Sequence, residues 1–497
     1  MNCEEYLQYD GLGLSELLFA GEVTPAELME CAISLAQRRG GRLNAICHPQ
    51  YEAARELAAA HVLQGPFGGL PLLLKDSGLA STRLPSSLGS RLFRDMRFSQ
   101  NATLVDRFER AGFLPFARTT VPELCMAPTT EAAVYGGPTL NPWDDSRSSG
   151  GSSGGAAAAV AAGVVPIAHG SDGGGSIRIP AAACGVYGLK PSRGLVPMGP
   201  TRGEGWGGLA CDGVLTRSVR DTAAVLDEIA GMETGAPYAA PPKPDSYLQA
   251  TFESTARPLK IAFWIQAWNQ IEISADAKAA VFQAAELCES LGHTVVETTP
   301  PDIDYEGFID ALIRVMAANI KVAVDTRLAT TGQTLQDDDL EPAMRDGYAL
   351  GARVSAAEYV MAIQRFHHIG RVFAAALTDV DLVLTPALTR TAVELGTISM
   401  RQPSFTEFRQ EAARYTTFLA LINAAGLPAA SVPINHGRDG LPVACQIVAG
   451  FGREDLILQL SAQLERAHPW SHRRPAFADE RAGARFPGQA HGQTGGE

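Results

Sequence analysis

The amino-acid sequence predicts an α/β protein, an α/β/α sandwich in which helices cover both faces of a mixed central β-sheet. Short apolar runs of strand length alternate along the chain with longer segments of helical periodicity, which is the pattern of layered α/β folds. The 497 residues are 46% hydrophobic and their mean hydropathy is near zero, so a large buried core can form. The chain has no internal repeat, which argues against a solenoid.

The first elements lie before residue 80. Helical periodicity runs through residues 25–63. Thr24, Pro25 and Glu27 predict its start, with a threonine cap, a proline in the first turn and a capping-box glutamate. Residues 68–77 then predict a buried strand of leucines that ends in a lysine.

The later elements follow the same alternation. Residues 220–231 predict a helix capped by Asp221, and the proline-rich residues 235–258 predict a surface connector. Three strands are expected at 260–264, 293–297 and 382–386, with an amphipathic helix between the first two and another at 455–465. From about residue 478 to residue 497 the composition turns to Gly, Arg, Gln and Glu, which predicts a disordered tail.

Charge and cysteine content exclude several classes of protein. A net charge of −13 and a pI near 5.3 argue against a nucleic-acid-binding surface. The longest apolar stretch, residues 156–168, is too short to span a bilayer, and residues 1–5 lack the pattern of a signal peptide. The eight cysteines form no Cys-x-x-Cys pair and no metal-ligand cluster. We therefore expect no metal, no cofactor and no membrane, and a location in the reducing cytoplasm.

The most distinctive segment contains two serine sites flanked by glycines. Residues 148–155 are all serine or glycine, and they lead into an alanine-rich stretch and a short apolar run. Residues 170–178 then place Ser176 directly after three glycines. Glycine lets the backbone approach a ligand closely, and successive N–H groups can bind an anion. This pattern predicts a serine nucleophile beside an oxyanion hole.

Three alternatives compete for this segment. A flexible linker has the same composition, but this run leads directly into a strong helix former. A phosphate-binding loop needs a Gly-Lys-Ser/Thr ending or a Gly-x-Gly-x-x-Gly motif after a strand, and neither occurs. A Ser-His-Asp triad could use His169, but its place at the end of an apolar run favours a structural histidine. The Gly-x-Ser-x-Gly elbow would need a glycine where Arg178 stands.

The predicted strand at residues 68–77 offers a different base. Lys75 follows three leucines directly, so burial is expected to favour its neutral amine and lower its pKa. The competing interpretation is a lysine at a strand end that extends its amine to solvent. The residues around Lys75 alone do not separate the two.

These residues together resemble the amidase signature family. The lysine strand and the two glycine–serine motifs appear in the family's order and at its spacing, and the resemblance covers nearly the whole chain. Within the family the chain is similar to bacterial amidases of the nylon-oligomer hydrolase type, and carbamate-cleaving members are also similar. Further matching segments are 141–143, 184–191, 426–429 and 440–443.

The resemblance implies a Ser–cis-Ser–Lys triad. Ser176 would be the nucleophile, Lys75 the base, and Ser152, which follows a cis peptide bond and lies 24 residues before Ser176, the bridging serine. The backbone N–H groups of Ser176 and of the three glycines before it would bind the oxyanion; these are Gly173, Gly174 and Gly175. Ser153 is expected to form hydrogen bonds within its loop, and Arg178 to pair with Asp172.

The resemblance also implies one domain and an apolar pocket. It predicts a single amidase domain over residues 1–477, with residues 300–410 forming a helical substrate cap. Met126 and Thr129 match the family segment that lines the acyl pocket, although ordinary loop packing would explain them equally well. Trp206 could line this pocket or anchor the core. An apolar or aromatic acyl or leaving group is therefore expected to bind better than a charged one, and Arg118 is the only basic residue between positions 112 and 147.

Three classes of function are compatible with these motifs. The favoured one is a stand-alone serine amidohydrolase that cleaves apolar or aryl amides, carbamates and esters. The alternative is a glutamine-dependent amidotransferase subunit that supplies ammonia to a partner; Ile179, where those subunits usually have glutamine, counts against it. A catalytically inactive binding protein is the third, and the intact triad counts against that. The expected partner is a small-molecule amide or carbamate, and the oligomeric state is left open, with a homodimer as the candidate.

Overall fold

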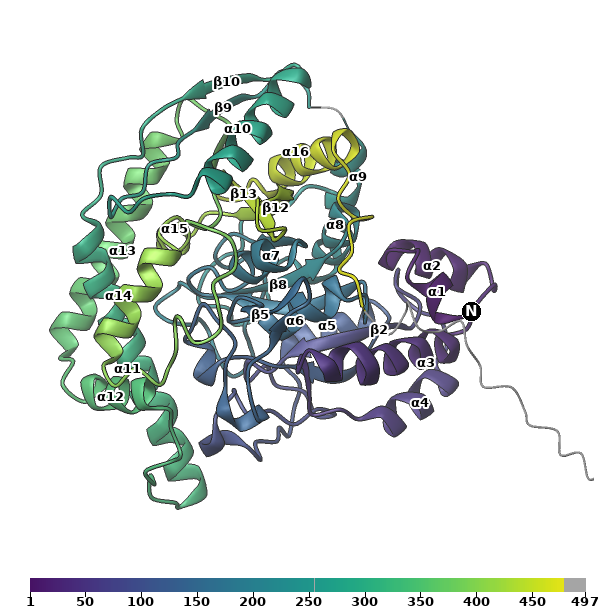
Figure 1. Ribbon diagram of the computed structural model, residues 1–497. Helices are drawn as coiled ribbons and strands as arrows, with labels where there is room; N and C mark the ends of the chain where they lie inside the picture. Colours follow the sequence, from purple (N-terminus) through teal and green to yellow (C-terminus); the bar gives the residue numbers. More distant parts are fainter. Residues whose placement is uncertain (254, 478–497) are drawn as a thin grey trace, which may run out of the picture.

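The computed structural model describes residues 1–253 and 255–477, and its centre is an 11-stranded mixed β-sheet (Figure 1). The order of the strands is β1-β3-β2-β6-β8-β7-β12-β13-β11-β9-β10. Their bounds are β1 Ile46–Cys47, β2 Leu70–Lys75, β3 Phe113–Thr119, β6 Ile167–Asp172, β7 Tyr187–Lys190, β8 Cys211–Thr216, β9 Lys260–Phe263, β10 Thr294–Glu297, β11 Leu382–Pro386, β12 Ala429–His436 and β13 Pro442–Ala449; a separate two-stranded sheet holds β4 Leu140–Asn141 and β5 Asp144–Ser148.

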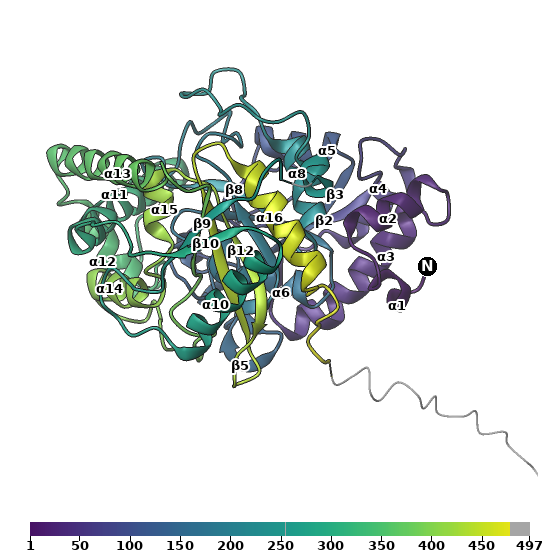
Figure 2. The ribbon, with the colours of Figure 1, turned by 90° about the horizontal axis from the view of Figure 1, so that it is seen from above.

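Helices surround the central sheet, as the two perpendicular views show (Figures 1 and 2). The α-helices are α1 Cys3–Tyr6, α2 Gly11–Phe19, α3 Pro25–Leu35, α4 Tyr51–Ala60, α5 Thr103–Arg110, α6 Gly154–Ala161, α7 Arg178–Cys184, α8 Val219–Ile229, α9 Tyr247–Phe252, α10 Ala275–Ser290, α11 Tyr305–Thr331, α12 Pro342–Gly351, α13 Ala356–Ala376, α14 Phe405–Tyr415, α15 Ala420–Ala425 and α16 Glu454–Ala467. Short helical turns are η1 Ala36–Gly40, η2 Arg91–Phe93, η3 Glu123–Cys125 and η4 Ala133–Tyr135. The predicted α/β fold with a mixed central sheet is confirmed.

The sheet is mixed because parallel pairs lie toward both ends and a run of antiparallel pairs, from β6 to β11, fills its middle. β2 runs parallel to both β3 and β6, whereas β8 is antiparallel to β6 and to β7. At the other end β9 is parallel to β10 and to β11. Parallel strands finish at the same edge of a sheet, so β2 and β6 bring their carboxyl ends together. Lys75, at the end of β2, and the second glycine–serine motif, at the end of β6, therefore lie at the same edge of the sheet.

The N-terminal helix prediction is partly correct. Thr24 caps α3 with a complete capping box to Glu27, and Pro25 lies in the first turn, as expected. The helix does not continue to residue 63, because the chain changes to the π-helical turn η1 and then forms β1 before α4. Pro49, just before α4, lacks the backbone N–H that a continuous helix would use.

The prediction that Asp221 caps the helix at 220–231 is wrong. Ser218 is the cap: its side chain accepts from the Asp221 N–H, and the helix starts at Val219. The Asp221 carboxylate instead accepts the N–H groups of Gly11 and Leu12 at 2.7 and 2.9 Å, at the start of α2. The aspartate therefore joins two distant helices, a contact that local sequence does not reveal.

Most of the later predictions match the structure. The strands β9, β10 and β11 and the helices α10 and α16 lie within a few residues of the expected ranges. The connector at 235–258 contains one additional helix, α9, which Ser246 caps. The predicted tail at 478–497 lies outside the described residues.

The segment from 300 to 410 forms a separate helical layer. Helices α11 to α14 gather on the side of the molecule opposite α1 to α4 (Figures 1 and 2), and β11 within the same segment joins the central sheet. Within residues 1–253 and 255–477, no helix combines the length and the apolar character that crossing a bilayer requires.

Candidate active site

Lys75 lies at the end of β2, beneath two serines. Its side chain is fully buried, and Nζ lies 2.8 Å from Ser152 Oγ, 2.9 Å from Ser171 Oγ and 3.1 Å from the Ser171 carbonyl oxygen. Burial lowers the pKa of Lys75, and the negative charges of nearby groups oppose that shift only in part. Because the carbonyl oxygen can only accept, a neutral amine can donate to Ser171 and keep its lone pair for the Ser152 hydroxyl proton.

Ser152 and Ser176 both line one cavity. The backbone next to Ser152 is so closely packed that a side chain larger than that of glycine does not fit at position 151. The peptide bond between Gly151 and Ser152 is cis, as the resemblance implies. A Cβ at Gly151 would lie 2.5 Å from the Thr129 carbonyl oxygen, so only glycine fits there. The N–H of Ser153 donates to the Ser176 carbonyl at 3.2 Å, which joins the two serine motifs.

The helix α6 fixes the first serine motif against the sheet. Every residue of this Gly- and Ala-rich helix is buried, and a Cβ at Gly155 would lie 2.5 Å from the Thr120 amide nitrogen. Small side chains thus let the helix approach the sheet closely. The Ser153 hydroxyl lies at the same junction and donates to the Ser171 carbonyl at 3.3 Å, so it holds the first motif to the second.

The glycine turn before Ser176 supplies fewer free N–H groups than expected. The Gly175 N–H, which was expected to bind an oxyanion, donates to Asp172 Oδ1 at 2.6 Å and is therefore already engaged within the turn. Among the described residues, the N–H groups of Gly173, Gly174 and Ser176 donate to no other group. Three donors of the predicted nest therefore stay available.

Asp172 and Arg178 form the predicted ion pair beneath this turn. Both side chains are fully buried, and Arg178 Nε and Nη2 donate to the two carboxylate oxygens at 2.9 and 3.0 Å. Burial alone would raise the pKa of Asp172, but the Arg178 guanidinium holds it well below its usual range. The charged aspartate can therefore orient the Gly175 N–H, which shapes the turn that carries Ser176.

His169 has structural contacts rather than a place beside the serines. It lies in β6, where its Nδ1 accepts the Lys75 backbone N–H at 3.2 Å and its Nε2 lies 3.1 Å from Asp212 Oδ1. Because Nδ1 accepts, Nε2 carries the proton and donates to the carboxylate. Both ring nitrogens are thus engaged, which agrees with its interpretation as a structural residue, although His169 lies within β6 and not at a strand end.

A cavity of about 740 Å³ opens above the two serines. Met126 and Trp206 line it, together with Gly173, whose Cα faces the Trp206 ring so closely that a Cβ would lie 2.7 Å from it. Thr129 is not among the described residues that line the cavity: its buried hydroxyl donates to the Ile398 carbonyl at 2.8 Å. Thr129 therefore supports the pocket segment without facing the cavity.

Residues from the helical layer complete the cavity wall and hold the Met126 segment. One face of α11 lines the cavity through Asn319, Ile320, Val322, Ala323, Thr326, Arg327 and Thr330. Arg409 on α14 donates to the Met126 carbonyl at 2.8 Å, and the N–H of Glu341 donates to Glu123 at 2.7 Å. The cap was expected over all of residues 300–410, and within the described residues only α11 of that range lines the cavity.

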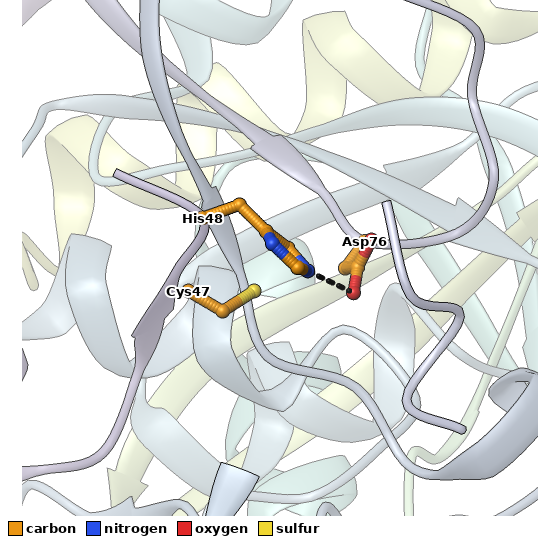
Figure 3. Close-up of side chains that lie close together, drawn as sticks. All are labelled: Cys47, His48 and Asp76. Carbon is orange, nitrogen blue, oxygen red and sulfur yellow. Dashed lines mark ion pairs between the residues drawn. The ribbon is translucent and has the colours of Figure 1, made fainter. Parts of the chain in front are cut away.

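A group of potential metal ligands lies behind Lys75. Ligand atoms of Cys47, His48 and Asp76 lie within 4.8 Å of one another (Figure 3). The Asp76 carboxylate already accepts hydrogen bonds from the side chains of Ser86, Ser87 and Tyr135. Burial raises the pKa of the Cys47 thiol well above its ordinary value, so the thiol keeps its proton. These residues, which no sequence motif marks, fit a hydrogen-bonded anchor for the end of β2 better than a metal site.

Several residues of the site could not be found from their local sequence. Ser171 lies within the glycine motif but was not assigned a contact with Lys75, which it bonds through two oxygens. Cys125 lines the cavity, and burial raises the pKa of its thiol while the nearby Lys75 charge opposes that shift in part. No motif marks Cys125; its position next to Met126 was the only signal.

Comparison with known proteins places the chain in a family. The Amidase family profile matches residues 27–458, so the chain belongs to the Amidase family and is a hydrolase that acts on amide bonds. The 6-aminohexanoate-cyclic-dimer hydrolases of Paenarthrobacter ureafaciens and Pseudomonas sp. strain NK87 are each 34% identical to it over 94% of this chain and 97% of theirs.

Solved structures agree with this assignment. The structure of 6-aminohexanoate cyclic dimer hydrolase has a TM-score of 0.88 at 33% identity, covering 94% of this chain and 99% of its own. A bacterial aryl acylamidase of the amidase signature family has a TM-score of 0.84 at 28% identity over 93% of this chain and 97% of its own. A glutamyl-tRNA(Gln) amidotransferase subunit of Thermotoga maritima has a TM-score of 0.69 at 25% identity, covering 94% of this chain and 95% of its own.

Proposed function

We propose that the protein is a serine amidohydrolase that cleaves the C–N bonds of apolar or aryl amides, and also carbamates and esters, through an acyl-enzyme on Ser176. The observation that carries this proposal is the fully buried Lys75 amine, 2.8 Å from Ser152 Oγ, beneath a cavity that Ser152 shares with Ser176. A buried lysine with a lowered pKa can act as a base without a histidine.

The proposed reaction moves one proton through the two serines. Neutral Lys75 accepts the Ser152 proton, Ser152 accepts the Ser176 proton, and Ser176 Oγ bonds to the substrate carbonyl carbon. The N–H groups of Gly173, Gly174 and Ser176 stabilise the oxyanion. The relay returns the proton to the leaving nitrogen as the C–N bond breaks, and water then hydrolyses the acyl-enzyme to release the acid.

Carbamates and esters fit the same chemistry. The nucleophile and the oxyanion donors act on the carbonyl alone, and the relay can protonate a leaving nitrogen or a leaving oxygen. The cavity of about 740 Å³ with Met126 and Trp206 in its wall supports an aryl group on either side of that carbonyl. An aryl carbamate is therefore expected to be cleaved alongside an aryl amide.

The eight cysteines support a cytoplasmic location for this activity. All of them are free thiols, and six are buried. Free buried thiols suit a reducing compartment.

Hydrolysis by the purified chain tests the proposal. We expect release of 4-nitroaniline from a 4-nitroanilide, hydrolysis of a phenyl carbamate, and a transient mass increase on Ser176 equal to the acyl group. The matched control is Ser176→Ala, which should show neither turnover nor the mass increase. A chain that cleaves free glutamine but neither aryl substrate would instead favour the amidotransferase alternative.

A further inference from the structure

We propose that the opening of the cavity is a carboxylate-binding subsite formed by Arg97, Arg202 and Arg327, which selects amides that have an apolar body and an anionic far end. All three arginines line the same cavity as Ser152 and Ser176. The inference rests on the proposed function and narrows its substrate class. The sequence analysis predicted that apolar groups bind better than charged ones. The subsite adds a negative charge at the end of the substrate that lies far from the reacting carbonyl.

The ionic residues of the cavity wall leave positive charge unbalanced. Two carboxylates also line the cavity, Asp212 beside the neutral His169 at 3.1 Å and Glu204, which accepts the Tyr238 hydroxyl at 3.2 Å, so the three arginines exceed them by one charge. Within residues 1–253 and 255–477, Arg202 makes no hydrogen bond or ion pair, and neither does Arg97. An anion entering the cavity would therefore meet available guanidinium groups.

Arg327 is held in place at this opening. Its Nε donates to the Leu92 carbonyl at 3.0 Å, and its guanidinium lies 5.9 Å from the centre of the Phe93 ring. Its two terminal nitrogens have no hydrogen-bond partner among the described residues. A guanidinium fixed through Nε keeps those planar donors ready for a carboxylate, which reduces the entropy lost on binding.

Arg202 adds an exposed guanidinium group to the wall of the cavity that contains Ser152 and Ser176. It is exposed in the loop that carries Trp206, and it lines the cavity together with Cys125. Arg97 is exposed on the segment that follows η2. Two of the three guanidinium groups are therefore exposed to solvent at the cavity wall, where their positive charge attracts an anionic substrate.

The cavity wall also has a large apolar part. It consists chiefly of large hydrophobic side chains from three separate segments: Leu88, Phe93, Met96, Phe98, Met126 and Ile320. An alkyl or aryl chain fits this wall, and its far carboxylate would reach the guanidinium groups. The predicted substrate is thus an amide, anilide or carbamate whose acyl part ends in a carboxylate.

Two matched substrates test the subsite. Adipic acid mono-4-nitroanilide carries a carboxylate at its far end, and heptanoic acid 4-nitroanilide has a neutral chain of similar length. We expect the ratio of their kcat/KM values to favour the carboxylate and to fall roughly fivefold in Arg202→Gln, the upper range for a solvent-exposed ion pair. Arg97→Gln and Arg327→Gln should lower the same ratio, and raised salt should reduce it in the wild type.

Arg94→Gln is the matched control, because Arg94 is an exposed arginine beside η2 that does not line the cavity. Arg202→Glu should also invert the preference toward a 4-nitroanilide with a terminal ammonium group, which a purely structural role would not do. A ratio that none of the three glutamine variants changes, or that Arg94→Gln lowers equally, would overturn the subsite.

A binding measurement separates this proposal from the proposed function. Calorimetry with Ser176→Ala should show weaker binding of the carboxylate anilide when Arg202→Gln is added, with no need for turnover. Failure of the wild type to hydrolyse either anilide would refute the aryl-amide function alone. Equal binding of the carboxylate anilide with and without Arg202→Gln would refute the subsite alone.

Discussion

Replacing Lys75 by methionine should remove nearly all turnover while keeping an unbranched side chain in the core. The side chain is fully buried, and three oxygens surround Nζ at 2.8 to 3.1 Å, so bulk water does not reach the position of the base. A general base contributes about 10²–10⁴-fold, and we expect a loss of this order or larger in kcat. Adding Ser152→Ala should cost little more, because the two groups act in one relay.

The assay is release of 4-nitroaniline in the single and double variants, beside two controls. Lys190 is also a fully buried lysine, but its Nζ donates to the Pro191 carbonyl at 2.7 Å, so Lys190→Met reports the cost of losing a buried amine elsewhere. His169→Gln tests the histidine alternative. The relay would be refuted if Lys75→Met lost no more activity than Lys190→Met, or if His169→Gln lost as much as Ser176→Ala.

The pH profile gives a second test of the same base. Burial lowers the pKa of Lys75 below the ordinary 10.5, and the active form is the neutral amine. Activity should therefore be absent at acid pH and rise as pH passes upward through the lowered pKa, before a free lysine would titrate. A rate that stays flat from mildly acid to mildly alkaline pH would contradict this assignment.

Three further predictions follow from local geometry. Gly151→Ala should impair folding or activity because its Cβ would overlap the Thr129 carbonyl oxygen, whereas Gly137→Ala, with open space around the Cβ, should be tolerated in thermal melts. Thr24→Ala should destabilise the protein by about 1 kcal/mol through loss of the capping box at α3, as measured by denaturant unfolding. EDTA should leave hydrolysis unchanged, because the Asp76 carboxylate already accepts several hydrogen bonds and the Cys47 thiol stays protonated; a loss restored by a divalent cation would contradict this.

The parts of the site that depend on short motifs were predictable from the sequence. Lys75 ends a run of leucines, and each proposed catalytic serine lies in a glycine-rich turn, so both the residues and the need for close backbone approach are visible locally. The Asp172–Arg178 pair was predictable for the same reason, since its members lie six positions apart. The strands were equally clear, because β2 and β11 are continuous buried runs rich in apolar residues.

Contacts between distant segments were beyond the reach of the sequence. Aspartate is a common helix cap, so the sequence predicts that Asp221 caps its own helix. Its carboxylate instead accepts the N–H of Gly11 at the start of α2, some 210 residues away. Thr129 matches a pocket motif, but its hydroxyl donates a hydrogen bond to the Ile398 carbonyl and does not line the cavity. In both cases a polar side chain could satisfy its hydrogen bonds locally or over a distance, and only the packed fold decides.

The arginines of the cavity illustrate how this limit affects substrate prediction. The one basic residue near the pocket motif in sequence is Arg118, which the structure buries with its guanidinium on backbone carbonyls, including that of Lys75. The three arginines that do line the cavity come from the η2 segment, the Trp206 loop and α11, which lie far apart along the chain. In the proposed function the motifs would determine which bond is cleaved, whereas side chains that meet only after folding would select the substrate attached to that bond.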